Sequence, residues 1–241
     1  RPGSGYNTYP MNLGNWSAAS DYMNNWTKFY QGIRSATYFI QHIDDNKEIR
    51  ELPNGQELID QYKAEARFLR AFFYYGIIRQ YGPAILLGDT PIAGDLSPTD
   101  EEMQQPRNSY DECVDYIVSE LDLAAQKLPK HFTAQGENDY GRATQAACKA
   151  IKSRLLLLAA SPQFNGNADY AGFRNLDGKQ LVSAQYDREK WKRAADAARD
   201  VITGFGLALY RKNDADGNFD PYLSTRDVFL DPWNTEVIFA R

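Results

Sequence analysis

Apolar residues in this chain recur every three or four positions over several long stretches, which is the period of one face of an α-helix. The period is maintained over about residues 22–43, 57–80, 110–128, 143–160 and 187–203. Residues 236–241, by contrast, read as the beginning of a strand. The sequence therefore predicts a mainly α-helical protein with little β structure.

The segment from Tyr62 to Pro83 carries two apolar stripes instead of one. The first consists of Tyr62, Ala66, Leu69 and Phe73, and the second of Phe68, Phe72, Tyr75 and Arg79. A helix with two apolar faces needs neighbours on both sides, so we expect it inside an array of helices. Arg67 and Arg70 lie among these positions. Each is expected to meet a carboxylate or a backbone carbonyl, because a buried unpaired guanidinium costs several kcal/mol.

Capping and breaking residues mark the helix boundaries. Ser109 is followed three positions later by Glu112, a capping box that predicts a helix beginning at Tyr110. Ser161-Pro162 predicts the end of the fourth helix, since the residue before a proline avoids the helical conformation.

Two tryptophans fall on helical stripes. Trp26 begins the stripe of the first helix, and Trp191 shares the stripe of the fifth helix with Ala195, Ala198 and Ile202. A large ring on a periodic apolar stripe is most often a packing residue. We therefore expect both tryptophans in helix–helix interfaces.

The arrangement of the helices along the chain indicates the architecture. Bulky residues on one helix and alanines on its neighbour are typical of helix hairpins stacked as in tetratricopeptide arrays. Two connections, 84–108 and 161–186, are long and irregular, and such loops on a rigid frame commonly carry binding surfaces. We predict one helical domain over residues 1–241, cut short at both ends.

Composition excludes some partners. The 241 residues carry a formal net charge of -5 with both signs interspersed, and no run of Lys and Arg is dense enough to follow a phosphate backbone. No stretch of about 18 apolar residues is present, so no membrane-spanning helix is predicted. Cys113 and Cys148 both lie on predicted helices, and buried free thiols are favoured over a bridge, although the sequence leaves their pairing open.

No catalytic constellation is found. His42 and His131 have no Cys, His or carboxylate at ligand spacing, and phosphate loops and nucleophile motifs are missing. The segment Asp214–Asp220 offers oxygen ligands at every second residue, as calcium requires. Its spacing departs from an EF-hand, so a solvated turn is favoured over a calcium site and no cofactor is predicted.

Two further tryptophans lie outside the helical stripes, in a chain whose aromatic content is 13%. Trp16 follows Tyr9, Asn12 and Asn15 in one irregular segment, and Trp233 lies in another. An aromatic face complements the C–H face of a sugar ring, and amides complement its hydroxyl rim. These five residues are candidates for a glycan site. The alternative, that each loop packs its ring onto an apolar shelf, fits the sequence equally well.

Four blocks of sequence together carry a family resemblance. They are Asn25-Trp26-x-x-x-Tyr30-x-x-Ile33-Arg34-x-Ala36; Tyr62-Lys63-Ala64-Glu65-Ala66-Arg67-Phe68-Leu69-Arg70-Ala71 continuing to Tyr81-Gly82; Gly141-Arg142-Ala143-Thr144 with Lys152-Ser153-Arg154-Leu155 and Ala160-Ser161-Pro162-x-Phe164-Asn165; and Glu236-Val237-Ile238-Phe239. In content and order they resemble the SusD/RagB family, the surface nutrient-binding lipoproteins of Bacteroidota. The blocks extend over most of the chain.

The resemblance implies a fold and a role. It implies tetratricopeptide-like helix pairs that support a larger ligand-binding half, much of which follows this point in full-length members. It also implies a lipid-anchored protein at the outer-membrane surface that binds a polysaccharide or oligosaccharide. Such a protein lies over a SusC-type TonB-dependent transporter and passes the ligand inward without breaking a bond. The chain contains no lipobox cysteine, so the anchor is expected from relatives only.

Two other functions stay open at this point. Some members of the family bind peptides, so a SusD-like receptor for peptides or protein fragments is one alternative. A helical-repeat scaffold that binds another protein through its concave face is the other. Quenching of tryptophan fluorescence by a glycan would separate the first function from both.

Overall fold

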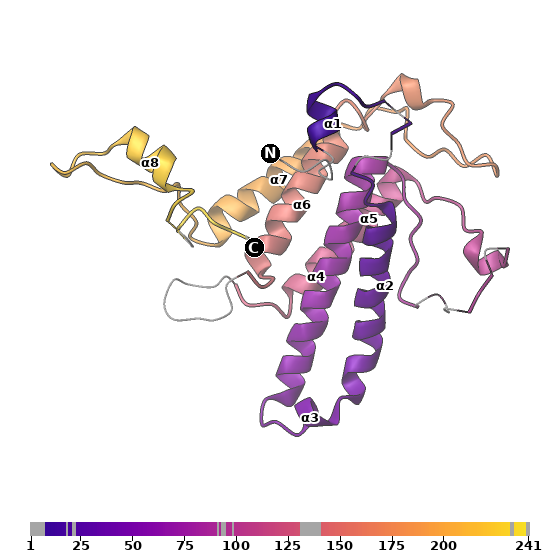
Figure 1. Cartoon of the computed structure of the whole chain (residues 1–241), viewed down its shortest axis with the longest axis horizontal. Coiled ribbons are helices and arrows are strands. Elements are labelled where there is room, and N and C mark those ends of the chain that lie inside the picture. The colour runs from indigo at the N-terminus through magenta and orange to yellow at the C-terminus, as the bar shows by residue number, and fades with distance from the viewer. Residues whose placement is uncertain are drawn as a thin grey trace.

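In the computed structural model, the chain folds into a succession of α-helices joined by irregular loops (Figure 1). The structure describes residues 8–17, 19–20, 23–90, 92, 95–97, 99–130, 141–231 and 234–239. Within these ranges the β structure consists of two isolated antiparallel bridges, Arg174 with Gln180 and Asn213 with Phe219. The prediction of a mainly α fold is confirmed.

The helices follow one another in an array. Their bounds are α1 (Thr8–Asn12), α2 (Trp26–His42), α3 (Lys47–Arg50), α4 (Gly55–Tyr81), α5 (Tyr110–Ala125), α6 (Gln145–Ala160), α7 (Arg188–Gly204) and α8 (Pro221–Asp227), with 3-10 turns η1 (Ile43–Asp45), η2 (Glu101–Met103) and η3 (Ala168–Tyr170). Helix α2 packs on α4, α4 on α5, α5 on α6, and α6 on α7. In Figure 1, α2 and α4 form a long antiparallel hairpin with α3 at its tip. This serial packing is that of a tetratricopeptide-like array.

Capping residues set most helix starts. Ser109 Oγ accepts a hydrogen bond from the Glu112 N–H at 3.2 Å, and the Glu112 carboxylate accepts one from the Ser109 N–H at 2.7 Å. The predicted capping box is therefore confirmed. At α6, Thr144 Oγ1 accepts a hydrogen bond from the Ala147 N–H at 3.1 Å.

Two helices are shorter than predicted. α2 begins at Trp26 instead of about residue 22, because Asn24 Oδ1 accepts a hydrogen bond from the Trp26 N–H at 3.1 Å and ends the preceding loop there. α5 ends at Ala125, and Leu128 is buried in the turn that leads to Pro129. Local polar contacts thus shorten segments that the apolar period would extend.

Helix α4 lies inside the array and is buried on two faces. Ala66 of the first predicted stripe and Phe68 and Tyr75 of the second are buried, as expected. Leu69 is exposed and so is Arg79, which contradicts the prediction at these positions. The reason is that α2 and α5 cover two sides of α4 and leave a third side open.

Two glycines let α2 and α4 approach closely. A Cβ atom at Gly32 in α2 would lie 2.5 Å from Phe73, and a Cβ atom at Gly76 in α4 would lie 2.7 Å from Phe29. Each phenylalanine ring therefore fills the space that the opposite glycine leaves, and the two rings have centroids 6.3 Å apart. Close packing of this kind leaves no room for an added methyl group.

The two arginines of α4 find their predicted carboxylate. Arg70 is fully buried, and its Nη2 lies 2.6 Å from Glu120 of α5 and 2.6 Å from Asp89, while Nη1 donates to Thr37 of α2 at 3.2 Å. Arg67 pairs with the same Glu120 carboxylate. Burial is the largest single influence and lowers the pKa of the Arg70 guanidinium, but Glu120, Tyr116 and Asp89 together raise it by more, so that the pKa of Arg70 lies above its ordinary value. The cluster ties α2, α4 and α5 together.

Helix α7 buries a different face from the one predicted. Ala194 and Ala197 are buried, whereas Trp191 is 40% exposed and Ile202 is 72% exposed. The interface prediction for Trp191 is therefore wrong. α7 is the last helix of the array and packs mainly on α6, while its Lys190 forms an ion pair with α5 at 2.6 Å. These contacts turn the alanine side inward and leave the tryptophan stripe outside.

Residues 205–231 form an arm that projects from the array on the left of Figure 1. The acidic segment in this arm is a turn, in which Asp214 Oδ1 accepts hydrogen bonds from the N–H groups of Asp216 at 3.0 Å and Asn218 at 2.9 Å. The sequence favours a turn over a calcium site for this segment, and the structure shows a turn. The Asp214 carboxylate accepts the hydrogen bonds that stabilise it.

The predicted terminal strand is wrong over its described residues, 236–239, which form a turn and a bend. Phe239 instead packs against Phe68 and Phe72 of α4, with ring centroids 5.4 and 6.4 Å apart. A strand needs a neighbouring strand to receive its backbone hydrogen bonds. The neighbouring element here is a helix, which offers side chains only.

Cys113 and Cys148 are free thiols, and both are buried. Burial raises the pKa of Cys113 to about 11 and that of Cys148 to about 12. The favoured interpretation of the two cysteines is confirmed. In the described part of the chain, no helix is long and apolar enough to cross a membrane.

Candidate functional site

Most of the predicted glycan residues lie on a short segment before α2. The prediction that this segment is irregular is wrong for Tyr9 and Asn12, which lie in helix α1. Helix α1 ends in a Schellman motif, in which the Asn15 N–H donates to the Pro10 carbonyl at 2.9 Å and the Gly14 N–H donates to the Met11 carbonyl at 3.0 Å. Gly14 has a φ of 72°, the left-handed conformation that this motif requires. The motif turns the chain directly before Trp16.

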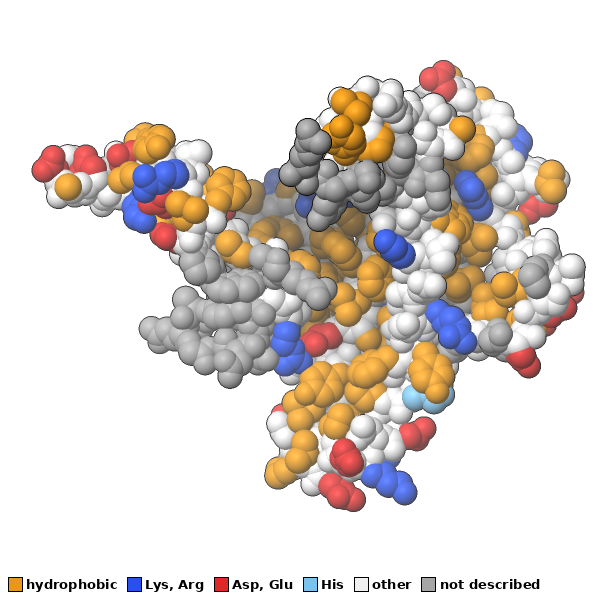
Figure 2. Space-filling model, viewed as in Figure 1, with side chains coloured by type: hydrophobic (Ala, Val, Ile, Leu, Met, Phe, Trp, Pro, Cys, Tyr) orange, Lys and Arg blue, Asp and Glu red, His pale blue; other side chains and the backbone are white. Residues whose placement is uncertain are grey.

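The side chains of this segment are open to solvent. Tyr9 is 48% exposed, Trp16 is 56% exposed, and Asn12 and Asn15 are exposed as well. Figure 2 shows hydrophobic side chains at the surface over α1. We call these four residues the α1 surface. The fifth predicted residue, Trp233, lies outside the described residues.

The chain between the α1 surface and α2 is fixed to the end of α4. Tyr81 Oη accepts hydrogen bonds from the N–H groups of Asn25 at 2.8 Å and Trp26 at 3.2 Å, and it donates to Asn24 Oδ1 at 3.0 Å. The Trp26 ring lies edge-on to the Tyr81 ring, with centroids 5.3 Å apart. The predicted packing role of Trp26 is confirmed. The first two blocks of the family resemblance thus meet through hydrogen bonds.

A strained residue lies in this connection. Met23 has a φ of 57°, and its carbonyl accepts a hydrogen bond from Gln80 Nε2 at 2.7 Å. A left-handed conformation at a residue other than glycine costs about 1 kcal/mol or more and persists where neighbouring contacts impose it. The contacts with α4 therefore determine how residues 23–25 lead into α2.

The loop that follows α4 is held against the array by tyrosine hydroxyls. Tyr30 Oη accepts a hydrogen bond from the Ile85 N–H at 2.9 Å and donates to the Ile85 carbonyl at 3.0 Å. Tyr74 Oη accepts one from the Leu87 N–H at 3.0 Å. Burial raises the pKa of Tyr74 to about 12 and raises that of Tyr30 as well. Both hydroxyls therefore stay protonated and hold the loop in one position.

A cavity of about 460 Å³ lies between α2 and this loop. Its walls are mainly apolar and include Trp26, Tyr30, Leu87, Ile92 and Met103. Its volume falls in the range of small-molecule sites, about 300–1,000 Å³. The sequence gives no direct sign of this cavity, because Trp26 lies on a helical stripe, where a large ring is expected to pack. The signal that points to it is the length of the 84–108 loop.

Residues of the third block join the remaining helices. Arg142 Nη2 lies 2.6 Å from Glu65 of α4. Asn165 is buried, donates to the Asp187 carbonyl at 2.9 Å and accepts a hydrogen bond from the Asp187 N–H at 2.7 Å, which joins the end of α6 to the start of α7. The residues that carry the resemblance therefore fix the order of the helices, and the exposed candidate residues lie before the first block.

Comparison with known proteins identifies the family. Residues 5–157, more than half of the chain, match the SusD-like family model that is described as starch-binding and associating with the outer membrane. The chain belongs to the SusD-like family. The resemblance drawn from the four sequence blocks is thereby confirmed, and the protein is a member of a carbohydrate-binding family.

Other SusD-like proteins are similar over most of this chain. A SusD-like protein of Bacteroides ovatus is 24% identical over 211 residues, which cover 86% of this chain and 33% of that protein. Among solved structures, BT4246 is similar with a TM-score of 0.67 at 32% identity. The matched region covers 84% of this chain and 32% of the BT4246 chain. A structure with a xylogluco-oligosaccharide shares the fold at 22% identity, with a TM-score of 0.57 and coverage of 86% and 34%. This chain therefore spans about a third of the length of its relatives.

Proposed function

We propose that this SusD-like protein captures a polysaccharide or oligosaccharide at the cell surface and that the α1 surface contributes to the binding site. The starch-binding description of the family supports a glycan as the ligand class. A structural neighbour with a xylogluco-oligosaccharide supports it further. The observation that carries the location is the exposure of two aromatic rings, Tyr9 and Trp16, beside two exposed amides, Asn12 and Asn15.

The chemistry of this surface suits a sugar ring. A pyranose offers an apolar face of C–H groups that stacks on an aromatic ring, and its hydroxyl groups pair with amide donors and acceptors. One such stack contributes about 1 kcal/mol, by analogy with aromatic pairs. Useful affinity therefore requires several contacts along one chain, and we include Trp233 and residues beyond Arg241 among the further contributors. The proposed role is binding, without cleavage of a bond.

The test compares two exposed tryptophans. Binding to a panel of neutral and acidic polysaccharides that includes starch and xyloglucan is measured by affinity electrophoresis and by quenching of tryptophan fluorescence. Replacement Trp16→Ala is expected to weaken binding by several-fold to tenfold and to leave the thermal midpoint nearly unchanged. Trp191→Ala is the matched control, because Trp191 is also exposed but lies on α7, and it is expected to bind like the wild type.

Two results would contradict this location. If Trp16→Ala lowers stability by the roughly 3–5 kcal/mol typical of a lost core aromatic and binding per folded molecule is unchanged, Trp16 is structural. If no polysaccharide of the panel binds but peptides do, the protein is a SusD-like receptor for peptides or protein fragments. If neither polysaccharides nor peptides bind, and another protein binds on the concave face, the helical-repeat scaffold is favoured.

The family description also supports a cellular partner. We propose that the mature protein is lipid-anchored at the outer membrane and delivers its glycan to a SusC-type TonB-dependent transporter, since its family associates with that membrane. Co-purification of the full-length protein with a large outer-membrane transporter supports this proposal. Recovery of the full-length protein from the cytoplasm, without any membrane partner, argues against it.

A further inference from the structure

A second hollow opens at the other end of α2, between that helix, the η1 turn and α4. Its volume is about 950 Å³. Its lining includes Arg34, Tyr38, Phe39, His42, Asp45 and Tyr62. It shares Arg34 alone with the cavity under the 84–108 loop. Neither the predicted glycan residues nor the family blocks explain the aromatic residues at positions 38 and 39.

Two rings of this hollow form a preformed stack. The rings of Tyr38 and His42 have centroids 3.9 Å apart and planes inclined by only 20°. His42 Nδ1 lies 2.7 Å from the Tyr38 carbonyl oxygen, which can only accept, so Nδ1 carries the proton and donates. This hydrogen bond fixes the orientation of the His42 ring, and the ring in turn holds Tyr38.

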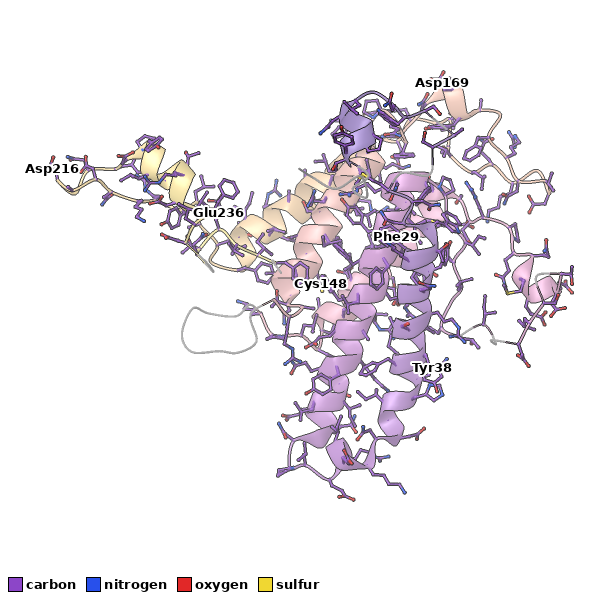
Figure 3. All side chains as sticks on the ribbon, viewed as in Figure 1. Phe29, Tyr38, Cys148, Asp169, Asp216 and Glu236 are labelled. Carbon is purple, nitrogen blue, oxygen red and sulfur yellow. The ribbon has the colours of Figure 1, made fainter. Side chains whose placement is uncertain are left out.

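The Tyr38 ring keeps a free face. A stacked ring contacts its neighbour through one face, and Tyr38 remains 54% exposed. Figure 3 shows Tyr38 projecting from α2 into solvent near the tip of the hairpin. Phe39, the next residue, is 42% exposed. Tyr38 and Phe39 are therefore two neighbouring exposed rings on α2, and both line the hollow.

Size and chemistry identify the occupant. A hollow of this volume is in the range of small-ligand sites, about 300–1,000 Å³. The aromatic rings that line the hollow lie beside polar side chains. Two of these, Arg34 and Asp45, are exposed, and neither forms an ion pair with another described residue. Flat rings beside unpaired hydrogen-bonding groups match a sugar, whose apolar face and hydroxyl rim need both.

We propose that this hollow is a second saccharide contact, in which Tyr38 stacks on a sugar ring and Arg34 and Asp45 bind its hydroxyl groups. This proposal rests on the proposed function and adds a subsite to it. Tyr38 lies 12 residues along α2 from Trp26, at which the helix begins, and this separation is about 18 Å at 1.5 Å per residue. A long polysaccharide reaches both contacts at once, whereas an oligosaccharide of two rings reaches only one.

The length of the glycan therefore provides the test. The probe is the polysaccharide of the panel that the wild-type chain binds best, together with its own oligosaccharide of two rings. Tyr38→Ala is expected to weaken binding of the long polysaccharide by threefold to tenfold, because one of two linked contacts is lost. Arg34→Ala is a second variant with the same expected direction and keeps the tyrosine in place. Tyr222→Ala is the matched control, because Tyr222 is an exposed tyrosine on α8 and lines neither cavity.

The outcomes separate this proposal from the proposed function. If the long polysaccharide binds Tyr38→Ala and Arg34→Ala as tightly as the wild type while Trp16→Ala weakens it, the second contact is wrong and the α1 surface stands. If both hollow variants weaken the polysaccharide more than they weaken the oligosaccharide, the second contact is supported. If the wild-type chain binds no polysaccharide, both proposals fail. A circular dichroism melt equal to that of the wild type shows that each variant is folded.

Discussion

The hydroxyl group of Tyr81, the last residue of α4, accepts a hydrogen bond at 2.8 Å from the backbone N–H of Asn25, directly before α2 begins. The two residues are distant in sequence, yet this bond and its companion to Trp26 at 3.2 Å position the start of α2. The same contact fixes the chain that leads from the α1 surface. A residue of the family motif thus supports the candidate site without facing the ligand.

Removal of this hydroxyl should loosen the start of α2. Tyr81→Phe leaves the ring packed on Trp26 but deprives the Asn25 N–H of its acceptor and leaves the Trp26 N–H with Asn24 Oδ1 alone. An unsatisfied buried donor typically costs about 1–3 kcal/mol. We expect a lower urea midpoint with an unchanged slope. Tyr222→Phe, at an exposed tyrosine, should leave the midpoint unchanged. A Tyr81→Phe variant as stable as the wild type would show that water replaces the hydroxyl and that the anchor contributes little.

The two glycines between α2 and α4 should not tolerate a methyl group. A Cβ atom at Gly32 or Gly76 would lie within 2.5 or 2.7 Å of a phenylalanine ring, and overpacking of this kind costs about 1–3 kcal/mol. Alanine also favours the helix over glycine by up to about 1 kcal/mol. The measured loss of stability is therefore the cost of overpacking minus this gain. We expect Gly32→Ala and Gly76→Ala to lower the thermal midpoint.

A third glycine provides the control for this prediction. Gly204 ends α7 with open space around it, so Gly204→Ala should change stability by no more than about 0.5 kcal/mol. A second check is Gly32→Ala combined with Phe73→Leu, which should recover part of the loss because the smaller side chain makes room. Equal stability of all three glycine variants would mean that the rings move aside freely.

The projecting arm should lose its structure in acid. Hydrogen bonds from Arg226 and then from Lys212 hold the pKa of Asp227 at about 2, below its ordinary value of 3.8. Since the folded arm binds the proton more weakly than the unfolded arm, the stabilisation is present above about pH 4 and is lost as the pH falls towards 2. NMR signals of the α8 amides should follow this window. In Asp227→Asn the same signals should be weaker at neutral pH and should respond less to acid; a wild-type arm unchanged at pH 2 would contradict the prediction.

The two cysteines should react slowly while the protein is folded. Both thiols are buried, and with a pKa of about 11 only about one Cys113 in a thousand is a thiolate at pH 8. We expect Ellman's reagent to label Cys113 and Cys148 slowly in buffer and rapidly in urea. Rapid labelling in buffer would place a thiol at the surface, and absence of labelling in urea without reductant would reveal a disulfide.

Local sequence signals were enough wherever a boundary depends on neighbouring residues. The capping box of Ser109 and Glu112 defines the start of α5 in isolation, because both hydrogen bonds connect residues three positions apart. The arginines of α4 were also predictable, since a guanidinium on a buried stripe needs a carboxylate. Which carboxylate it finds, Glu120 of α5, was not predictable, because that pairing depends on how α4 and α5 pack.

The candidate site shows the same division. The sequence indicates that Trp16 and Tyr9 lie outside the predicted helical stripes, but a ring outside such a stripe can be buried or exposed with equal ease, and Tyr9 in fact lies in the short helix α1. The structure leaves both rings open to solvent, and the Schellman motif at Gly14 places Trp16 beyond the end of α1. The cavity under the 84–108 loop and the hollow at Tyr38 were not predicted, because each is bounded by elements that are distant in sequence.

The sequence by itself determined the five longest helices, α2 and α4 to α7, most of their ends and the family, because the apolar period, the caps and the motif blocks are properties of neighbouring residues. It did not predict the short helices α1, α3 and α8. The tertiary structure alone decided which side of each helix is buried. Trp191 and Leu69 lie on apolar stripes and are nevertheless exposed, since α7 has its main neighbour on one side and α4 is covered on only two. The free energy of burial depends on what lies opposite a side chain, and only the assembled array supplies that neighbour.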